Sequence, residues 1–195
     1  MKTIRRTFAL LALLSAGRGL QAEEPWEGGF KLTASTFSGA EAAYLGQGRA
    51  YGLAIFGRYP LGRSNGLAFE GGYKFLPTTT HAFASSSWED KSDGYYASAL
   101  YQHRLGFEGF ALQGGVRLAQ YVAARRANFF PGDGTSVLTK TRGDYSTTVK
   151  PMVGACYRLN GQYGLELNLV STEMKNVQGE AKSGVMVELA LLVHL

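Results

Sequence analysis

The chain has 195 residues, enough for one domain, with 20 basic and 15 acidic residues and a formal net charge of +5. Four of the basic residues lie within residues 1–22, so the remaining 173 residues carry 16 basic and 15 acidic side chains, a net charge of +1. This balance gives no reason to expect a nucleic-acid partner. The single cysteine, Cys156, cannot form an internal disulfide and is expected to be a small buried side chain.

The amino terminus predicts an export signal. Lys2, Arg5 and Arg6 precede an apolar run at residues 8–16, and Ala22 offers a small residue for cleavage. The apolar run is too short to span a bilayer as a helix. We therefore expect two parts: a secretory signal peptide at residues 1–22 and a folded domain at residues 23–195.

Eight segments alternate apolar and polar residues with a period of two, which is typical of strands with one apolar face. The clearest is at the carboxyl terminus, where Val185, Val187, Leu189, Leu191 and Val193 share a face. The segments are residues 28–36, 50–59, 67–75, 94–102, 110–120, 145–158, 163–171 and 184–195. Pro151 inside the sixth segment predicts a bulge or a local break, because proline cannot donate a ladder hydrogen bond.

The connections between the segments alternate in length. Short ones fall at residues 60–66, 105–109 and 159–162, and long ones at 37–49, 76–93, 121–144 and 172–183. This alternation over an even number of strands is typical of outer-membrane barrels, with turns on the periplasmic side and loops outside. The predicted fold is all-β: an eight-stranded antiparallel up-and-down transmembrane β-barrel.

A soluble, lipocalin-like barrel would turn the apolar set inward instead. Two observations favour the membrane barrel. No charged residue interrupts the apolar face of any segment, and a lysine or arginine facing mid-bilayer lipid costs roughly 2–4 kcal/mol. Aromatic residues of the apolar set also gather at segment ends, which predicts two interfacial girdles. Those residues are Trp26, Tyr59, Tyr101, Phe110, Tyr157 and Tyr163 at one rim, and Tyr51, Phe75, Tyr95 and Tyr145 at the other.

The opposite face of the segments combines small residues with charged ones. Placed by depth, three cations and three anions fall in the middle of the barrel, whereas Arg58, Arg158 and Lys74 fall near strand ends. Buried charges must be paired, so we expect a lumenal ion network rather than an open channel. Its members are Lys31, Glu70, Arg117, Lys150, Glu166 and Glu188.

Two stretches resemble a known family. "YGLAIFGRYPLGRSNGLAFEGGYKFLP" (residues 51–77) and "GACYRLNGQYGLELNLV" (residues 154–170) each set a strand, a short turn and a second strand in succession. In this the chain resembles the eight-stranded outer-membrane barrels of the OmpA/OmpX type, including opacity-like surface proteins. The resemblance implies a place in the outer membrane of a diderm bacterium, contact with lipopolysaccharide, and insertion by the barrel-assembly machinery. The family usually ends in an aromatic residue, whereas Leu195 ends this chain.

The resemblance leaves the physiological role open. We expect a monomeric, non-enzymatic barrel with a structural or surface-recognition role and with no cofactor or metal. The alternatives are a small pore, a hydrophobic-solute carrier and, ranked lower, a lipid A-modifying enzyme. None of the histidines (His81, His103 and His194) has a serine two residues away, as a deacylase of that kind would need.

The long connections offer candidate recognition sites. Arg125 and Arg126 precede Phe129 and Phe130, a combination that can bind phosphate groups of lipopolysaccharide or a protein partner. The alternative is that the two phenylalanines pack over the barrel mouth. Residues 88–90 (Trp-Glu-Asp) carry acidic groups whose spacing matches no calcium-binding loop, so we expect a solvated segment there.

Overall fold

A computed structural model describes residues 27–39, 48–75, 79–83, 86–106, 108–129, 137–143, 146–175 and 180–195. The expected signal peptide lies outside the described residues, as do Trp26, Phe130 and Tyr145. No helix that is long and apolar enough to cross a membrane occurs in the described part of the chain.

The described residues form ten strands, and every strand pair is antiparallel. The strands are β1 (Glu27–Gly39), β2 (Arg49–Pro60), β3 (Asn65–Phe75), β4 (Thr79–Phe83), β5 (Ser86–Arg104), β6 (Phe110–Phe129), β7 (Val137–Arg142), β8 (Ser146–Arg158), β9 (Tyr163–Lys175) and β10 (Ala181–His194).

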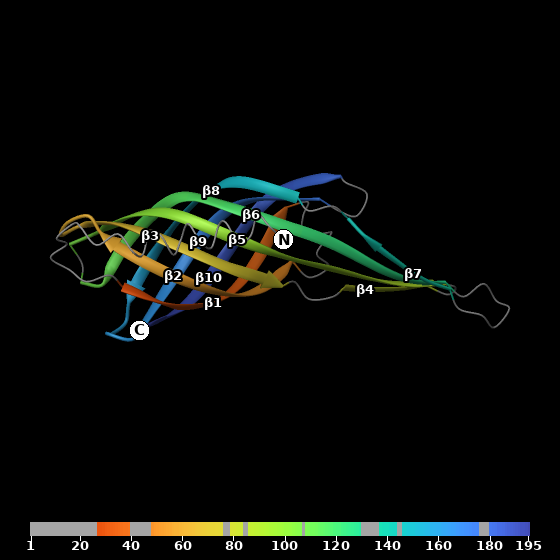
Figure 1. The fold of residues 1–195 in the computed structure, drawn as a ribbon, viewed down its shortest axis with the longest axis horizontal. Helices are drawn as coiled ribbons and strands as arrows, with labels where there is room; N and C mark the ends of the chain where they lie inside the picture. The colour runs from red at the N-terminus through yellow and green to blue at the C-terminus, as the bar shows by residue number, and fades with distance from the viewer. Residues whose placement is uncertain are drawn as a thin grey trace, which may run out of the picture.

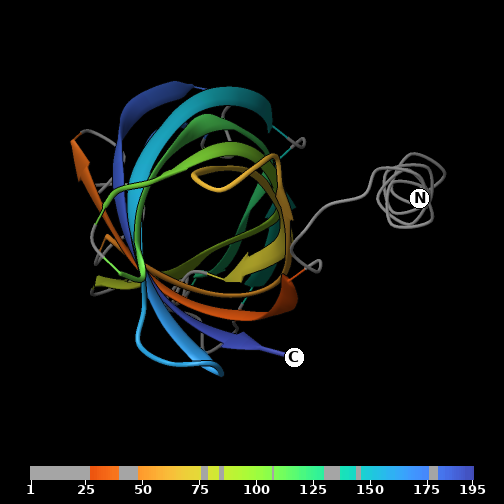
Figure 2. The ribbon, with the colours of Figure 1, turned by 90° about the vertical axis from the view of Figure 1, so that its left-hand side faces the viewer.

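Eight of these strands close into a barrel in the order β1-β2-β3-β5-β6-β8-β9-β10. The first strand pairs with the last, from Gly29 opposite His194 to Gly39 opposite Gly184. Figures 1 and 2 show the tilted strands from the side and the closed ring from one end. The predicted eight-stranded antiparallel barrel is therefore confirmed.

The short connections lie together at one end of the barrel, here named the turn end, and the opposite end is named the loop end. At the turn end Leu61 donates to Asn65 over 2.9 Å, and the Asn160 side chain accepts from the amides of Gln162 and Tyr163. Gly109 has a φ of +76°, which a side chain rarely adopts, and a Cβ there would lie 2.8 Å from the Arg158 carbonyl oxygen.

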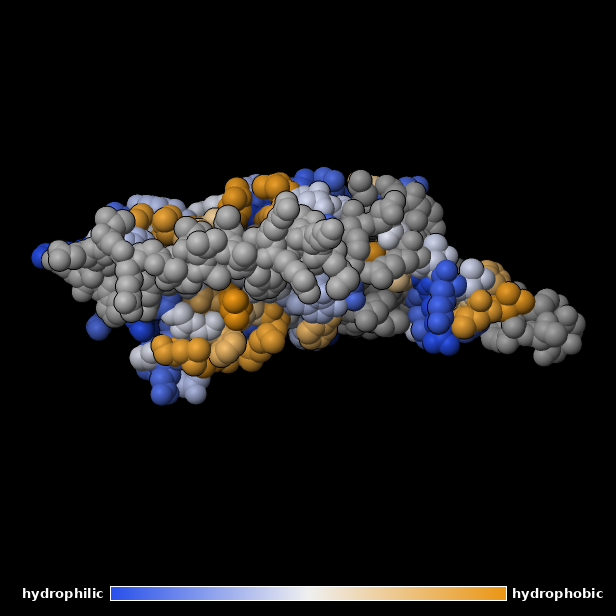
Figure 3. Space-filling model, viewed as in Figure 1, coloured by the Kyte–Doolittle hydropathy of each residue, from blue (hydrophilic) through white to orange (hydrophobic). Residues whose placement is uncertain are grey.

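The apolar face of each barrel strand points outward. In β10, Val185, Leu189 and Leu191 are exposed, while Met186 and Leu192 between them are buried. The outer wall in Figure 3 accordingly carries hydrophobic residues where the described atoms are visible. Such a surface is stable only against an apolar solvent, so these side chains face lipid hydrocarbon.

An aromatic girdle follows the loop end of the lipid-facing wall across β2, β3 and β5. The rings of Tyr51 and Phe75 lie 6.0 Å apart, those of Tyr73 and Phe75 6.5 Å apart, and those of Tyr73 and Tyr95 5.1 Å apart. Tyrosine rings favour the boundary between headgroups and hydrocarbon, so this row indicates where the bilayer ends on that side.

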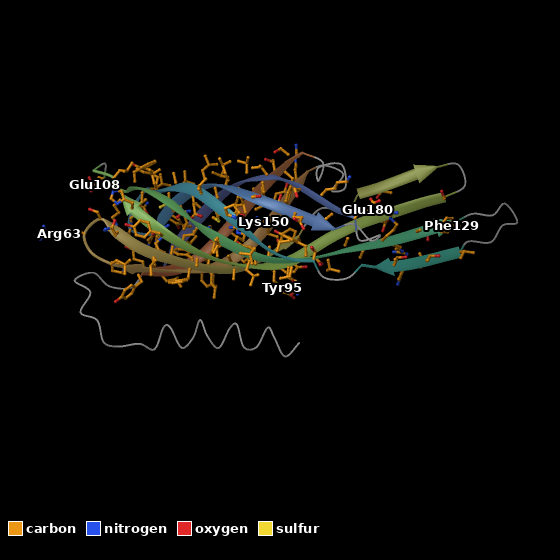
Figure 4. The ribbon with its side chains drawn as sticks, turned by 90° about the horizontal axis from the view of Figure 1, so that it is seen from above. Arg63, Tyr95, Glu108, Phe129, Lys150 and Glu180 are labelled. Carbon is orange, nitrogen blue, oxygen red and sulfur yellow. The ribbon has the colours of Figure 1, made fainter. Side chains whose placement is uncertain are left out.

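Two of the predicted long loops are largely strands. β5 and β6 have 19 and 20 residues and run well beyond the barrel, where β4 and β7 pair with their outer edges. The four segments form a sheet in the order β4-β5-β6-β7, named here the protruding sheet, which extends from the loop end (Figures 1 and 4). Outside the membrane a strand needs no apolar face, so the alternation that predicted the barrel strands is missing from these residues.

β8 is continuous through Pro151, and its pairing with β6 keeps one register from Phe110 opposite Tyr157 to Tyr121 opposite Ser146. The ladder between β8 and β9, however, runs only from Arg158 opposite Gly164 to Met152 opposite Val170. The described residues 146–151 and 171–173 make no strand pairs with each other across this gap, named here the β8–β9 seam. The predicted break thus affects one ladder, which ends next to the proline.

Because the apolar side chains of the barrel strands face lipid, replacing one of them with a charged residue should lower the stability of the barrel. Replacing Leu167, which lies in mid-β9 and is 51% exposed, with arginine should lower the free energy of unfolding in lipid vesicles by about 2–4 kcal/mol. Leu159→Arg, at an equally exposed residue of a turn, is the matched control and should change it far less. Urea titrations of the folded protein in vesicles measure both, and equal effects would contradict the lipid-facing assignment.

Candidate functional site

A cluster of paired charges fills the middle of the barrel, and Arg117 of β6 is its centre. The guanidinium donates to Glu70 of β3 over 2.6 Å and, through two nitrogens, to both carboxylate oxygens of Glu188 of β10 over 2.9 and 3.1 Å. Its Nε also donates to the Ser98 hydroxyl of β5 over 2.9 Å. A two-pronged pair of this kind fixes orientation as well as charge.

Two lysines complete the cluster. Lys31 of β1 pairs with Glu70 and, over 2.5 Å, with Glu166 of β9. Lys74 of β3 pairs with Glu188, and its ammonium also donates to the Ser35 hydroxyl over 2.6 Å. Three cations therefore meet three carboxylates, with every one of these six side chains at most 4% exposed. Their mutual attraction and hydrogen bonds offset the cost of removing them from water.

Five of the six residues predicted for the lumenal network are in this cluster, and Lys150 is not. Lys74, expected near a strand end, lies fully buried in its place. Strand tilt and side-chain length explain the difference, since Lys74 reaches toward the middle from a position opposite Gly52. A Cβ on Gly52 would lie 3.2 Å from the Lys74 Cγ, so the glycine leaves room for the lysine stem.

Arg117 on the neighbouring strand keeps Lys150 out of the ion cluster. Lys150 stands directly opposite Arg117 in the β6–β8 register, and two cations in opposed positions repel each other. The Lys150 ammonium instead donates to Glu173 of β9 over 2.8 Å, and the two side chains are 26% and 29% exposed. The contact spans the β8–β9 seam, where the two strands are not joined by ladder hydrogen bonds.

Polar and aromatic side chains extend the filling on both sides of the cluster. The Tyr96 ring lies 4.3 Å from the Arg117 guanidinium carbon and 5.6 Å from the Lys74 ammonium. Toward the turn end, Gln102 donates to Gln113, which donates to Asn168, each over 2.8 Å. The lumen is thus packed with bonded side chains across its middle.

The histidines with described side chains lie at the turn end. His103 is exposed, and its Nδ1 lies 2.8 Å from the Asn65 side-chain oxygen. His194 is buried, with its ring edge-on to Phe56 at 5.3 Å. Neither histidine forms a hydrogen bond with a serine among the described residues. In the described residues no group of three or more histidine, cysteine, aspartate or glutamate side chains could hold a metal ion.

The predicted recognition residues lie on the protruding sheet rather than in a loop. Arg125 and Arg126 are neighbours on β6, and because strand side chains alternate, they point to opposite faces. Arg126 is exposed in a row with Glu89 of β5 and Lys140 of β7, whereas Arg125 is half-buried and has a partner.

Phe129 lies at the end of the protruding sheet that is farthest from the barrel (Figure 4) and is 49% exposed. It therefore does not pack over the barrel mouth. Val137 and Leu138 of β7 are exposed beside it. Figure 3 shows a hydrophobic patch next to hydrophilic residues at this end of the molecule. Phe130 lies outside the described residues.

No protein-family model and no curated protein matches the chain. Among solved structures, the attachment invasion locus protein Ail of Yersinia pestis has 10% sequence identity and a TM-score of 0.45, over 87% of this chain and 96% of Ail. Neisserial surface protein A has 14% identity and a TM-score of 0.43 over the same shares of the two chains. The translocator domain of the autotransporter NalP from Neisseria meningitidis has 9% identity and a TM-score of 0.28, over 99% of this chain and 96% of that domain.

The different surroundings of Arg117 and Lys150 predict different costs of removal. Arg117→Met leaves Glu70 and Glu188 short of a buried partner and should lower the free energy of unfolding by about 3–5 kcal/mol. Lys150→Met breaks a partly exposed pair and should cost about 1 kcal/mol or less. Unfolding titrations in vesicles compare the two. Equal losses would contradict the placement of Lys150 outside the cluster.

The β8–β9 seam predicts a local difference in amide protection. Residues 147–150 of β8 pair on one side only, so about half of their amides lack a ladder acceptor. Hydrogen exchange followed by mass spectrometry should show faster exchange there than at residues 153–157, which pair on both sides. Equal protection along β8 would mean that the seam closes in the membrane.

Proposed function

We propose that this chain is a non-enzymatic outer-membrane protein that anchors a recognition surface at the cell exterior. The observation that carries the proposal is the combination of a lipid-facing barrel and a sheet that continues two of its strands beyond the membrane. A surface built on barrel strands is held in a fixed orientation, as a recognition surface requires.

The filled lumen supports an anchoring role over a transport role. The path along the barrel axis would have to pass Arg117, Lys31 and Lys74, each engaged with carboxylates and almost fully buried. Opening this path would separate several buried ion pairs at once, at a cost of several kcal/mol for each uncompensated charge. We therefore favour a closed barrel over the pore and over the solute carrier.

The protruding sheet supports recognition in two ways. One face presents the exposed cations Arg126 and Lys140 beside Leu138, with one anion, Glu89, opposite Arg126. The net positive charge of this row suits phosphate groups attached to an apolar or sugar body. Its outer strands β4 and β7 are also sheet edges, whose backbone groups can pair with an extended segment of another protein. Phosphate-bearing lipopolysaccharide is our first candidate ligand, and a protein partner is the second.

Fractionation and conductance test the anchoring role. The protein should remain with the outer membrane until detergent is added and should migrate faster unboiled than boiled on a denaturing gel. Planar bilayers containing it should show no steady single-channel currents. Steady currents that Lys31 or Arg117 variants alter would favour the pore, and a changed lipid A mass spectrum on expression would favour the enzyme.

A double variant tests the recognition surface. Arg126→Ser with Lys140→Ser removes two exposed cations of the protruding sheet, and we expect about a tenfold fall in retained lipopolysaccharide after detergent washing, measured by mass spectrometry. The control, Arg49→Ser with Lys182→Ser, removes two exposed loop-end cations that lie off this sheet. Equal retention by the two double variants would exclude the protruding sheet as the lipopolysaccharide site and would favour a protein partner.

A further inference from the structure

A cavity of about 430 Å³ opens at the turn end, on the opposite side of the ion cluster from the protruding sheet. The β2–β3 and β5–β6 connections form much of its wall, and Figure 4 places Arg63 and Glu108 from these connections at this end. Gln102, Ala111 and Cys156 line its inner part and are buried. The volume falls within the range of small-molecule sites, about 300–1,000 Å³.

The lining of the cavity is electropositive. Four arginines face two glutamates, which leaves a formal charge of +2 on the charged groups; they are Arg58, Arg63, Arg104, Arg158, Glu27 and Glu108. Arg158 donates to Glu27 over 2.7 Å, so this pair is internally neutral. The excess of positive charge therefore comes from β2, the end of β5 and the β2–β3 connection, which supply Arg58, Arg104 and Arg63.

Arg58 is the most constrained of these cations. It is 16% exposed, and its guanidinium carbon lies 5.4 Å from the centre of the Phe56 ring. Its Nη2 is buried and has no hydrogen-bond partner, and the nearest carboxylate oxygen, on Glu166, is 3.9 Å away. A buried N–H group without an acceptor is destabilising, and the described residues supply no acceptor within hydrogen-bonding distance of this nitrogen.

The rest of the lining indicates which kind of ligand would fit the cavity. Pro60, Leu105 and Phe110 supply apolar surface beside the arginines. An inorganic ion would leave this surface uncovered, whereas an organic molecule with a charged end would cover it. Guanidinium groups bind carboxylates and phosphates through paired N–H donors.

We propose that the turn-end cavity binds a small organic anion, with a carboxylate or phosphate group that accepts hydrogen bonds from Arg58. The remainder of the ligand lies against the apolar lining, and Arg63 in the exposed turn adds attraction at the entrance. Because the short turns face the periplasm in a barrel of this fold, the ligand comes from the periplasmic side. This site is separate from the recognition surface proposed above.

Three sugars of similar size provide the probes: neutral N-acetylglucosamine, N-acetylmuramic acid with a carboxylate, and N-acetylglucosamine 6-phosphate. Titration calorimetry on the folded protein in detergent should detect at least one of the anionic sugars and not the neutral one. Preference for the carboxylate would point to cell-wall fragments, and preference for the phosphate to phosphorylated sugars. Binding of neither anion, or equal binding of the neutral sugar, would overturn the proposal.

Variants connect the binding to Arg58. Arg58→Gln should weaken the anionic sugar roughly ten- to a hundredfold, as expected for a lost hydrogen bond to a charged group, and Arg58→Lys should weaken it less. Arg49→Gln removes the same charge at the loop end of the same strand and should leave affinity unchanged. If Arg58→Gln does not fold, Arg63→Gln in the exposed turn should weaken binding about threefold. Unchanged affinity in the tested arginine variant would overturn the assignment.

Cys156 supplies a second measurement in the unmodified protein. It is the only cysteine of the chain and lines the inner part of the cavity. A negatively charged methanethiosulfonate reagent should react with it faster than a positively charged one of similar size, and a bound anionic sugar should slow the reaction. The opposite charge preference, or a rate that the sugar does not change, would contradict an anion site at this position.

Discussion

The barrel depends on one constraint, which is that charges placed inside a narrow lumen must all be paired. Lys31, Lys74 and Arg117 meet this constraint with three carboxylates that come from β3, β9 and β10. Together with Ser98 the cluster connects six of the eight barrel strands. Buried apolar side chains such as Met152, Val170 and Met186 pack inside the barrel beside this cluster. These contacts, the strand ladders and the lipid-facing side chains together hold the strands in place.

The two remaining barrel strands show what the cluster requires of its surroundings. β2 contributes Gly52 and Ala54, small residues that leave space for side chains from the neighbouring strands. β8 contributes Lys150, which would add a fourth cation beside Arg117 and is instead held by Glu173 across the seam. The seam begins where the β8–β9 ladder ends, at Met152 next to Pro151. This break in the ladder lets Lys150 reach Glu173.

The period-two pattern predicted the strands and their orientation well because lipid tolerates no exception on the outer face. Depth inside the barrel was harder to predict. Lys74 and Lys150 share the inward register, and only strand tilt, side-chain reach and the opposed Arg117 decide which of them joins the cluster. The protruding sheet could not be read from alternation, because strands in water on both faces carry no such signal. The cavity around Arg58 combines residues from two connections and six strands, which no local pattern reveals.

The position of the ion cluster allows binding at each end of the barrel but opposes transport between the two ends. It lies between the turn-end cavity and the protruding sheet, and among the described side chains each of these presents more exposed or accessible cations than anions. A solute bound at Arg58 would meet the bonded Gln102 and Gln113 and then the paired charges before it reached the loop end. Passage would break contacts that hold six strands together. Binding at either end is therefore compatible with a stable barrel, whereas transport between the ends would require the barrel to lose its central support.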